Sequence, residues 1–376
     1  MDDDPTTGIF LARPERVVEG VRLAVKDLFD TAGLTTTYGS AIFADHVPST
    51  TADVVLRLEA SEYANVGKTN LHEFAYGITS TNPHFGTVPN PAAPGRIAGG
   101  SSGGSAAALA GGFAEAALGT DSGGSIRIPA ACCGVVGFKP SYGLVSLEGC
   151  FPLAPSFDHA GPMASTVADC TAMMSHLADG FQPLALESLD ELDVGVAWLD
   201  QAEPLVRARV SAAGALFTRS REIDFPLPHG TGPVFMAEVA DVHRELFAEN
   251  SDLYGDNVRT KIELCLLVTD AERRRSVRAR EEYRKHCEEA FGGLDLLITP
   301  TLAFVAPALP ADDLELREAM IRLTIPFNLL GWPALALPCG PAEDGLPASI
   351  QLVGRDDALV LAAGTLLEAS LVRGTP

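Results

Sequence analysis

Short apolar runs alternate along the chain with longer segments in which apolar residues recur every three or four positions. The short runs, rich in Val, Leu, Ile and Ala, are typical of buried strands. The longer segments are typical of helices that bury one face. The expected strands are residues 21–25, 192–198, 294–298, 333–337 and 348–353. The expected helices are residues 51–63, 166–177, 205–218, 272–291 and 357–370.

This alternation predicts an α/β fold with helices on both faces of a sheet. Ser165 or Thr166, with Asp169 nearby, indicates the start of one helix. No internal repeat is visible, and no linker rich in Pro, Gly and Ser divides the chain. We therefore expect one domain over residues 1–376.

The segment at residues 99–139 is rich in glycine and serine, but it lacks the composition of a linker. Its apolar blocks, at residues 106–110, 114–118 and 126–128, need burial. Two Gly/Ser turns are therefore expected inside the core. A buried turn must satisfy its backbone N–H groups, and glycines allow another group to approach closely. The pattern indicates a site that presents N–H donors to a ligand.

Composition and charge narrow the function classes. The chain has 376 residues, 47% of them hydrophobic, and can bury a large core. Its formal net charge of −22 repels nucleic-acid backbones and anionic membrane surfaces. The acidic residues 1–5 lack the apolar stretch of a signal peptide, and no apolar run reaches the ~18 residues of a membrane span. The 7 cysteines lack zinc-ligand spacing, so we expect a cytoplasmic protein with reduced thiols and neither metal nor other cofactor.

Three known kinds of motif compete for the Gly/Ser turns. A phosphate-binding loop needs Gly-Lys-Ser or Gly-Lys-Thr, but residues 103–105 are followed by alanines, and a dinucleotide-binding Gly-x-Gly-x-x-Gly turn is absent. Residues 99–103 fit the Gly-x-Ser-x-Gly turn of α/β-hydrolases, which requires a histidine late in the chain. The last histidine is His286, and it does not follow a late strand. The third candidate is a serine activated by a neutral lysine.

Lys26 is the candidate base of such a pair. It directly follows the apolar run at residues 21–25, where burial would lower its pKa by disfavouring the charged amine. An ordinary lysine at a strand end would instead extend to solvent. The apolar pattern by itself leaves both interpretations open.

Four segments together resemble the signature of the amidase signature family. They are Val-Lys-Asp at 25–27, Gly-Lys-Thr-Asn at 67–70, Gly-Gly-Ser-Ser-Gly-Gly-Ser at 99–105 and Gly-Thr-Asp-Ser-Gly-Gly-Ser-Ile-Arg-Ile-Pro at 119–129. Shorter matches lie at 137–140, 158–161, 299–301 and 328–338. The resemblance covers about residues 21–370, with a signature core at about 21–180. It implies a single large α/β domain with a mixed, twisted β-sheet covered on both faces by helices.

The resemblance also implies an amidohydrolase with a catalytic triad of Ser125, Ser101 and Lys26. Ser125 would be the nucleophile that forms an acyl-enzyme. Ser101, preceded by a cis peptide bond, would relay the proton of Ser125 to Lys26. Lys26 would later pass that proton to the leaving amine.

Residues near the triad are expected to form the oxyanion hole, to support the two turns and to line the substrate pocket. The oxyanion hole would be formed by the N–H groups of Ser122, Gly123, Gly124 and Ser125. Ser102, Asp121 and Arg127 would hold the two turns in place. The substrate pocket would include Phe74, Tyr76, Asn328 and Trp332, although the aromatic residues of this set could equally belong to the core.

Two departures from the family leave the oligomeric state and the substrate class open. The helical segment before Lys26 is shorter than in most relatives, and the stretch at about residues 200–290 is also short. Either a monomer or a homodimer is compatible with these differences.

The expected function is an amidase that releases ammonia from a small linear or aryl-substituted carboxamide, as indoleacetamide hydrolases do. Hydrolysis of urea-type or carbamate-type bonds would use the same triad. A glutaminase subunit of a tRNA-dependent amidotransferase would need partner subunits and an ammonia channel, and the short chain argues against it. A non-catalytic scaffold is disfavoured because all three triad positions are present. The expected partner is a small-molecule amide, with no nucleic acid and no membrane.

Overall fold

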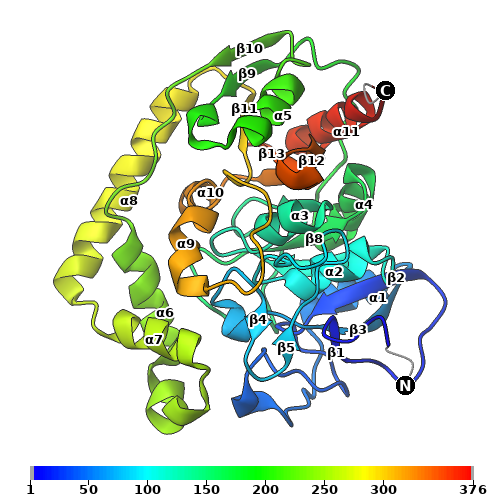
Figure 1. The fold of residues 1–376 in the computed structure, drawn as a ribbon, viewed down its shortest axis with the longest axis vertical. Coiled ribbons are helices and arrows are strands. Elements are labelled where there is room, and N and C mark those ends of the chain that lie inside the picture. Colours follow the sequence, from blue (N-terminus) through cyan, green and yellow to red (C-terminus); the bar gives the residue numbers. More distant parts are fainter. Residues whose placement is uncertain (1–3, 374–376) are drawn as a thin grey trace.

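The computed structural model describes residues 4–373, so residues 1–3 of the acidic N-terminal stretch lie outside the described part. An 11-stranded sheet runs through the molecule (Figure 1). In sheet order its strands are β1 (Phe10–Ala12), β3 (Tyr63–Thr69), β2 (Val21–Lys26), β6 (Ala116–Thr120), β8 (Ala160–Ala164), β7 (Val136–Lys139), β12 (Ala334–Pro341), β13 (Pro347–Val353), β11 (Leu296–Pro300), β9 (Asp193–Val196) and β10 (Arg219–Glu222). A separate hairpin consists of β4 (Thr81–Asn82) and β5 (Gly86–Thr87).

The sheet is parallel toward both ends and antiparallel in its middle. Strands β3, β2 and β6 are parallel neighbours, as are β11, β9 and β10. Between β6 and β11 all neighbouring strands run antiparallel, and so does the edge strand β1. The parallel strands β2 and β6 end at Lys26 and Thr120. The carboxyl ends of parallel strands meet at one edge of a sheet, which is where α/β proteins bind ligands.

Helices cover both faces of the sheet. One core contains α1 (Asp53–Glu59), α4 (Val167–Leu177), α5 (Pro204–Gly214) and α11 (Asp357–Arg373). The opposite core contains α2 (Gly103–Ala110) and α3 (Arg127–Cys133). Side chains alternate along a strand, so Leu23 and Val25 of β2 join the first core and Ala24 joins the second.

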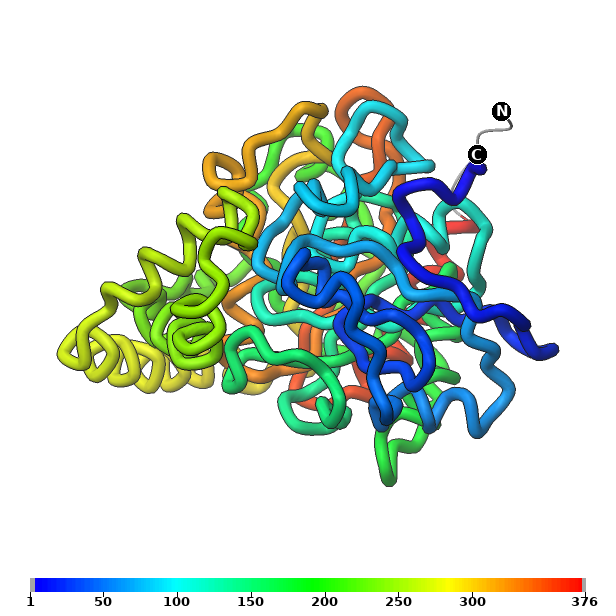
Figure 2. Tube along the Cα trace, turned by 90° about the horizontal axis from the view of Figure 1, so that it is seen from below, coloured from blue at the N-terminus to red at the C-terminus, as the bar shows by residue number. Residues whose placement is uncertain are grey.

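Further helices pack beside the sheet around an aromatic-rich core. They are α6 (Gly232–Asn250), α7 (Asp256–Leu266), α8 (Asp270–Phe291) and α10 (Ile325–Leu330). Helix α9 (Asp313–Ile321) packs instead in a smaller core with Ile78, Ile97 and Ile128. Figures 1 and 2 show α6 and α7 in yellow-green and α8 in yellow as an arm on one side of the body. Short 3-10 helices lie at Ala41–Phe43, Glu73–Ala75, Leu199–Gln201, Ser251–Leu253 and Glu343–Gly345.

The expected strands all form, and so do the expected helices, with some different ends. Helix α1 stops at Glu59, and Tyr63, expected to end a helix, begins strand β3. Helix α5 ends at Gly214 rather than at residue 218. At α4 the Thr166 hydroxyl accepts the Asp169 N–H, so Thr166 is the cap.

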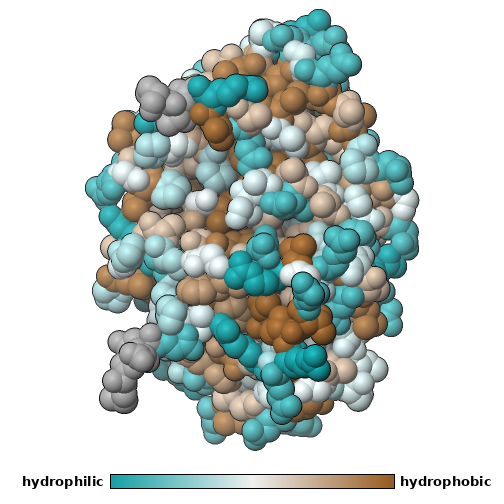
Figure 3. Space-filling model, turned by 90° about the vertical axis from the view of Figure 1, so that its right-hand side faces the viewer, coloured by the Kyte–Doolittle hydropathy of each residue, from teal (hydrophilic) through white to brown (hydrophobic). Residues whose placement is uncertain are grey.

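No helix within residues 4–373 is long and apolar enough to cross a membrane. Figure 3 shows hydrophilic and hydrophobic residues interspersed over one face of the molecule. Scattered apolar residues of this kind are ordinary on a protein surface.

Candidate active site

Strand β2 directs Lys26 into the protein interior. Leu23 lies on one face of the strand, and Ala24 and Lys26 fall on the other. The Lys26 side chain is fully buried, and its Nζ donates hydrogen bonds to Ser101 Oγ and Thr120 Oγ1, each at 2.7 Å. Burial lowers the pKa of Lys26 to about 7. A large share of this amine is therefore neutral at neutral pH, which the solvent-exposed alternative would not allow.

The first Gly/Ser turn fixes Ser101. The peptide bond between Gly100 and Ser101 is cis. The Ser101 carbonyl accepts hydrogen bonds from the His72 N–H at 3.2 Å and from Ser80 Oγ at 3.3 Å. A Cβ at Gly100 would lie 2.9 Å from the Ile78 carbonyl carbon, so a side chain is excluded there.

Ser102 ties the first turn to the second. Its Oγ donates to the Thr120 carbonyl at 3.2 Å and accepts the Thr120 N–H at 3.3 Å. Its own N–H donates to the Ser125 carbonyl at 3.2 Å. Ser102 therefore sets the position of Ser125 relative to Ser101.

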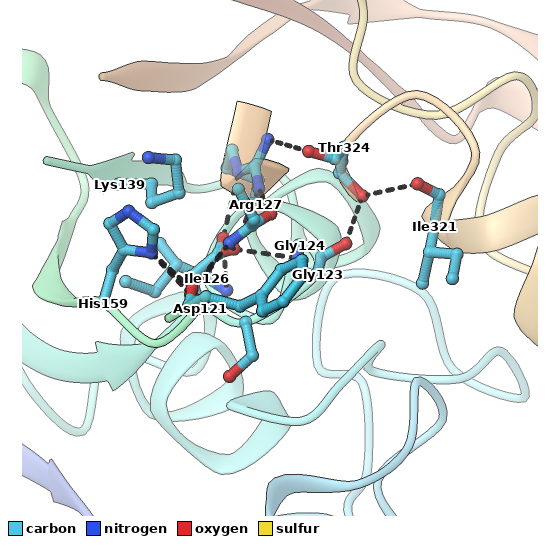
Figure 4. A network of polar contacts seen from close by, with 12 residues as sticks. Asp121, Gly123, Gly124, Ile126, Arg127, Lys139, His159, Ile321 and Thr324 are labelled. Atoms are coloured by element: carbon cyan, nitrogen blue, oxygen red, sulfur yellow. Dashed lines mark hydrogen bonds and ion pairs between the residues drawn. The ribbon is translucent and has the colours of Figure 1, made fainter. Parts of the chain in front are cut away.

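The second turn is built around the buried carboxylate of Asp121 (Figure 4). This carboxylate accepts the Gly124 N–H at 2.8 Å and the Ile126 N–H at 3.2 Å. It also accepts hydrogen bonds from Arg127 Nη2 at 2.8 Å and Nε at 3.0 Å. Burial disfavours the ionised form, but the Arg127 guanidinium outweighs it and holds the pKa of Asp121 well below its usual range. The ion pair thus keeps the turn closed.

Arg127 joins this turn to distant parts of the chain. Its Nη1 donates to the Thr324 carbonyl at 2.8 Å and to Gln351 Oε1 at 2.7 Å, and its Nη2 donates to Asn328 Oδ1 at 2.7 Å. Asn328 Nδ2 donates in turn to Asp121 Oδ1 at 2.8 Å. Asn328, expected in the substrate pocket, is fully buried and belongs to this scaffold instead.

Loss of the Arg127 charge should destabilise the whole protein. Arg127→Met leaves the Asp121 carboxylate buried without its cation, and such a change costs about 3–5 kcal/mol. We expect this loss in the free energy of unfolding measured in urea. The control is Arg273→Met, because Arg273 forms a surface ion pair with Asp241, and it should cost less than about 1 kcal/mol. Equal losses in both variants would contradict the scaffold role of Arg127.

One of the expected oxyanion donors is already occupied. The Gly124 N–H donates to Asp121, so we remove Gly124 from the set of free donors. Within residues 4–373, the N–H groups of Ser122, Gly123 and Ser125 have no hydrogen-bond partner. These three remain available to a ligand.

The two glycines of the turn are required for different reasons. Gly124 has a φ of +131°, and a Cβ there would lie 2.3 Å from Thr324 Oγ1. Gly123 has open space instead, because the nearest atom to its Cβ position is Ile325 Cδ1 at 3.8 Å. A side chain at Gly123 would fill the cavity next to Ser125.

Ser125 is 7% exposed and lines a cavity beside the turn. The cavity is bounded by Ser122, Gly123, residues 75–78, Leu153, Phe235, Arg317, Ile321 and Ile325. Within the described part of the chain, the Ser125 hydroxyl forms no hydrogen bond. The structure thus joins Lys26 to Ser101, while proton transfer from Ser125 to Ser101 stays a prediction.

A second cavity, of about 170 Å³, lies on another side of the same turn. Its lining includes Thr120, which contacts Lys26, and also Ser122 and Asp158. The Ser122 hydroxyl donates to Asp158 Oδ1 at 2.5 Å. Ser122 and Leu153 border both cavities, so the two cavities lie next to each other.

Only Tyr76 of the expected pocket residues lines the cavity with Ser125. Phe74 is fully buried, and its ring packs against Tyr254 with centroids 5.2 Å apart. Trp332 packs against Phe291 with centroids 5.0 Å apart. Phe74 is therefore a core residue, and Trp332 is half-buried and packs against the same core. Neither lines the cavity with Ser125, so their assignment to the pocket is corrected.

Sequence reasoning missed several residues around the site. Thr120 stands inside the signature segment, where its contact with Lys26 could have been suspected. Phe235, Arg317 and Ile321 lie on helices α6 and α9 and carry no motif signal. Only the packing of these helices brings them to Ser125.

Within residues 4–373, no group of three or more His, Cys, Asp or Glu side chains is placed to hold a metal ion. The cysteines are all free thiols. Ser125 lines its cavity with Ser122 and Gly123, and Ser101, hydrogen-bonded to Lys26, lies in the neighbouring turn. Serine, lysine and backbone N–H groups are the set that acyl transfer by a serine nucleophile requires.

A sequence profile of the family described as Amidase matches residues 9–185 and 184–361. The chain belongs to the amidase family. This amidase is 38% identical over 418 residues to a glutamyl-tRNA(Gln) amidotransferase subunit of Anaeromyxobacter dehalogenans (strain 2CP-C), covering 96% of this chain and 85% of that protein. It is 35% identical over 391 residues to AtzE, the 1-carboxybiuret hydrolase subunit of Pseudomonas sp. (strain ADP), covering 93% and 83% of the two chains.

Solved structures agree with this assignment. A crystal structure of an amidase superposes with a TM-score of 0.86 at 40% identity, covering 94% of this chain and 85% of that one. The structure of 6-aminohexanoate cyclic dimer hydrolase complexed with substrate gives a TM-score of 0.85 at 25% identity, covering 98% and 90%. These comparisons confirm three predictions. The fold is α/β, the chain belongs to the amidase family, and the protein is an amidohydrolase that acts on carbon–nitrogen bonds.

Proposed function

We propose that this amidase hydrolyses the carbon–nitrogen bond of a small linear or aryl-substituted carboxamide to an acid and ammonia, through an acyl-enzyme on Ser125. The observation that carries the proposal is the buried Lys26 amine, hydrogen-bonded to Ser101 at 2.7 Å and with a pKa of about 7. A lysine that is neutral at neutral pH can serve as a general base.

In the acylation step, Ser125 Oγ attacks the amide carbonyl carbon. The proton of Ser125 passes to Ser101, whose own proton moves to Lys26 Nζ. The N–H groups of Ser122, Gly123 and Ser125 have no other partner within residues 4–373 and can stabilise the oxyanion. Lys26 then returns its proton through Ser101 to the leaving nitrogen, so that the carbon–nitrogen bond breaks and ammonia departs.

Deacylation uses the same groups in the reverse direction. A water molecule loses a proton to the relay of Ser101 and Lys26 and attacks the acyl-enzyme carbonyl. The ester bond to Ser125 breaks, the proton returns to its Oγ, and the acid leaves. Asp121 and Arg127 are fully buried and act by positioning the turn, without touching the substrate.

The pH profile tests the lysine base. Lys26 works only when neutral, so kcat/KM for ammonia release should rise about tenfold per pH unit below its pKa of about 7 and level off above it. Burial also lowers the pKa of Lys139 to about 7, but its Nζ donates to the Pro140 carbonyl. Lys139→Met is therefore the control, and it should keep the midpoint. A flat profile, or a midpoint lost with Lys139, would contradict a Lys26 base.

A second candidate function is ammonia release from glutamine as one component of a tRNA-dependent amidotransferase. The 38% identity to a component of such an enzyme favours it. The purified chain alone should be assayed for ammonia release from glutamine, simple carboxamides and biuret. Hydrolysis of simple amides by the isolated chain supports the first function. Glutamine hydrolysis that appears only with partner subunits supports the second, and a preference for biuret would point to urea-type bonds.

A further inference from the structure

Arg317 is the one charged side chain among the described residues that line the cavity beside Ser125. It lies on α9 and is half-buried. Its guanidinium carbon lies 5.4 Å from the ring centroid of Tyr76 and 5.9 Å from that of Phe235. Within residues 4–373 it forms neither an ion pair nor a hydrogen bond. Aromatic rings are therefore its close partners in the described part of the chain.

Two buried lysines of the chain differ from Arg317, because each is paired with a carboxylate. Lys68 lies 3.1 Å from Asp27, and Lys261 Nζ lies 2.6 Å from Asp313. An unpaired buried lysine can lose its proton, as the lowered pKa of Lys26 illustrates. An arginine cannot do so, because its guanidinium stays charged at any ordinary pH. Arg317 therefore brings a permanent, unmatched positive charge to the cavity.

Among residues 4–373, no carboxylate is left to neutralise this charge inside the cavity. Asp313, one helical turn before Arg317, already accepts Lys261 Nζ and the Ile78 N–H, each at 2.6 Å. Asp158 lines the other cavity, where it accepts the Leu153 N–H at 2.9 Å. The chain as a whole has a net charge of −22, so a cation without a carboxylate partner is unusual in this protein.

The more exposed side chains that line the cavity lie on α9 and α10. The half-buried lining residues include Arg317, Ile321 and Ile325, which all belong to these helices. The enclosed volume is about 20 Å³, room for about one water molecule. A substrate must therefore displace some of these side chains. Arg317 has no ion pair or hydrogen bond within residues 4–373 that would have to break before its guanidinium turned toward a ligand.

We propose that Arg317 binds a carboxylate at the far end of the acyl chain, so that the preferred substrates are monoamides of dicarboxylic acids. The inference rests on the proposed function, because it assigns the specificity of the same cavity. A guanidinium binds a carboxylate through two parallel hydrogen bonds. The methylene groups between carboxylate and amide would contact the apolar lining, which includes Leu153, Phe235, Ile321 and Ile325.

The same lining predicts rejection of a second, positive charge. Within the described part of the chain, no acidic side chain lines this cavity. An α-ammonium group would therefore be desolvated near Arg317 without a partner. Glutaramate, which is glutamine without its amino group, should be hydrolysed faster than glutamine.

The test compares each monoamide with the diamide of the same diacid, which has the same shape and no charge. Ammonia release gives kcat/KM for succinamate, glutaramate and adipamate against succinamide, glutaramide and adipamide. Arg317→Met should lower kcat/KM for the best monoamide by about 10- to 100-fold, mainly through KM, and leave the diamide within about twofold. Arg317→Lys should restore part of the loss. Unchanged melting temperatures exclude a folding defect.

Two results would overturn the proposal. One is a wild-type preference for diamides, and the other is equal effects of Arg317→Met on monoamide and diamide. Binding of glutaramate to Ser125→Ala, measured by calorimetry, supplies a readout that needs no catalysis, and it should weaken by the same factor when Arg317→Met is added. Failure of the proposed amidase function would be recognised by a different result. In that case no amide would be hydrolysed, and Ser125 would not react with a fluorophosphonate.

Discussion

Ser125→Ala is expected to lower kcat/KM for amide hydrolysis by about 10⁶-fold, because the variant lacks the atom that forms the acyl-enzyme. The cavity lining and the free N–H groups stay in place, so substrate should still bind. Treatment of the wild type with a fluorophosphonate should add a single adduct, seen by intact-protein mass spectrometry. Peptide mapping should locate this adduct on Ser125, and the variant should take up none.

The matched control is Ser175→Ala. Ser175 is an exposed serine on α4, and its hydroxyl donates to the Thr171 carbonyl. This variant should keep full activity and full labelling. An adduct on any other serine, or labelling that survives in Ser125→Ala, would refute the assignment of the nucleophile.

Lys26→Met should lower kcat/KM by about 10⁴-fold or more, because methionine fills similar space but cannot accept a proton. Folding should be retained, since the substitution removes an amine whose burial disfavours its charged form. The rate of fluorophosphonate labelling should fall in parallel, because the probe reports activation of the Ser125 hydroxyl. Lys285→Met, at an exposed lysine of α8, should change neither rate.

Residues that act as one unit give non-additive losses. The double variant Ser125→Ala with Lys26→Met should therefore be no less active than Ser125→Ala alone. Additive losses would mean that Lys26 and Ser125 contribute independently, and the relay through Ser101 would have to be abandoned.

Strands were predicted correctly where the buried residues are also apolar in the sequence. Strands β9, β11, β12 and β13 carry apolar runs and were expected. Strand β3 was missed because it contains Asn65, Gly67 and Lys68, which the sheet buries and pairs in three dimensions. Strand β8 was missed because Gly161 and Pro162 are unusual inside a strand.

The chemistry was predictable because it is concentrated in short segments. The apolar run before Lys26 left its role open, and the resemblance of the Gly/Ser segments to the amidase signature singled out Lys26, Ser101 and Ser125. Their roles as nucleophile, relay and base remain predictions, although the hydrogen bond between Lys26 and Ser101 fits them. The Gly124 N–H was assigned to the oxyanion hole because the sequence does not reveal that Asp121 folds back to accept it.

The sequence by itself determined the family, the layered α/β fold and the segments that carry the catalytic chemistry, because these depend on local patterns of apolar residues and on short contiguous motifs. The tertiary structure alone decided which side chains surround Ser125. Asn328 is part of the scaffold, Phe74 lies in the core with Trp332 packed at its edge, and Arg317 reaches the cavity from α9. A pocket is made by residues distant in sequence whose meeting depends on how helices pack, and no local pattern records that packing.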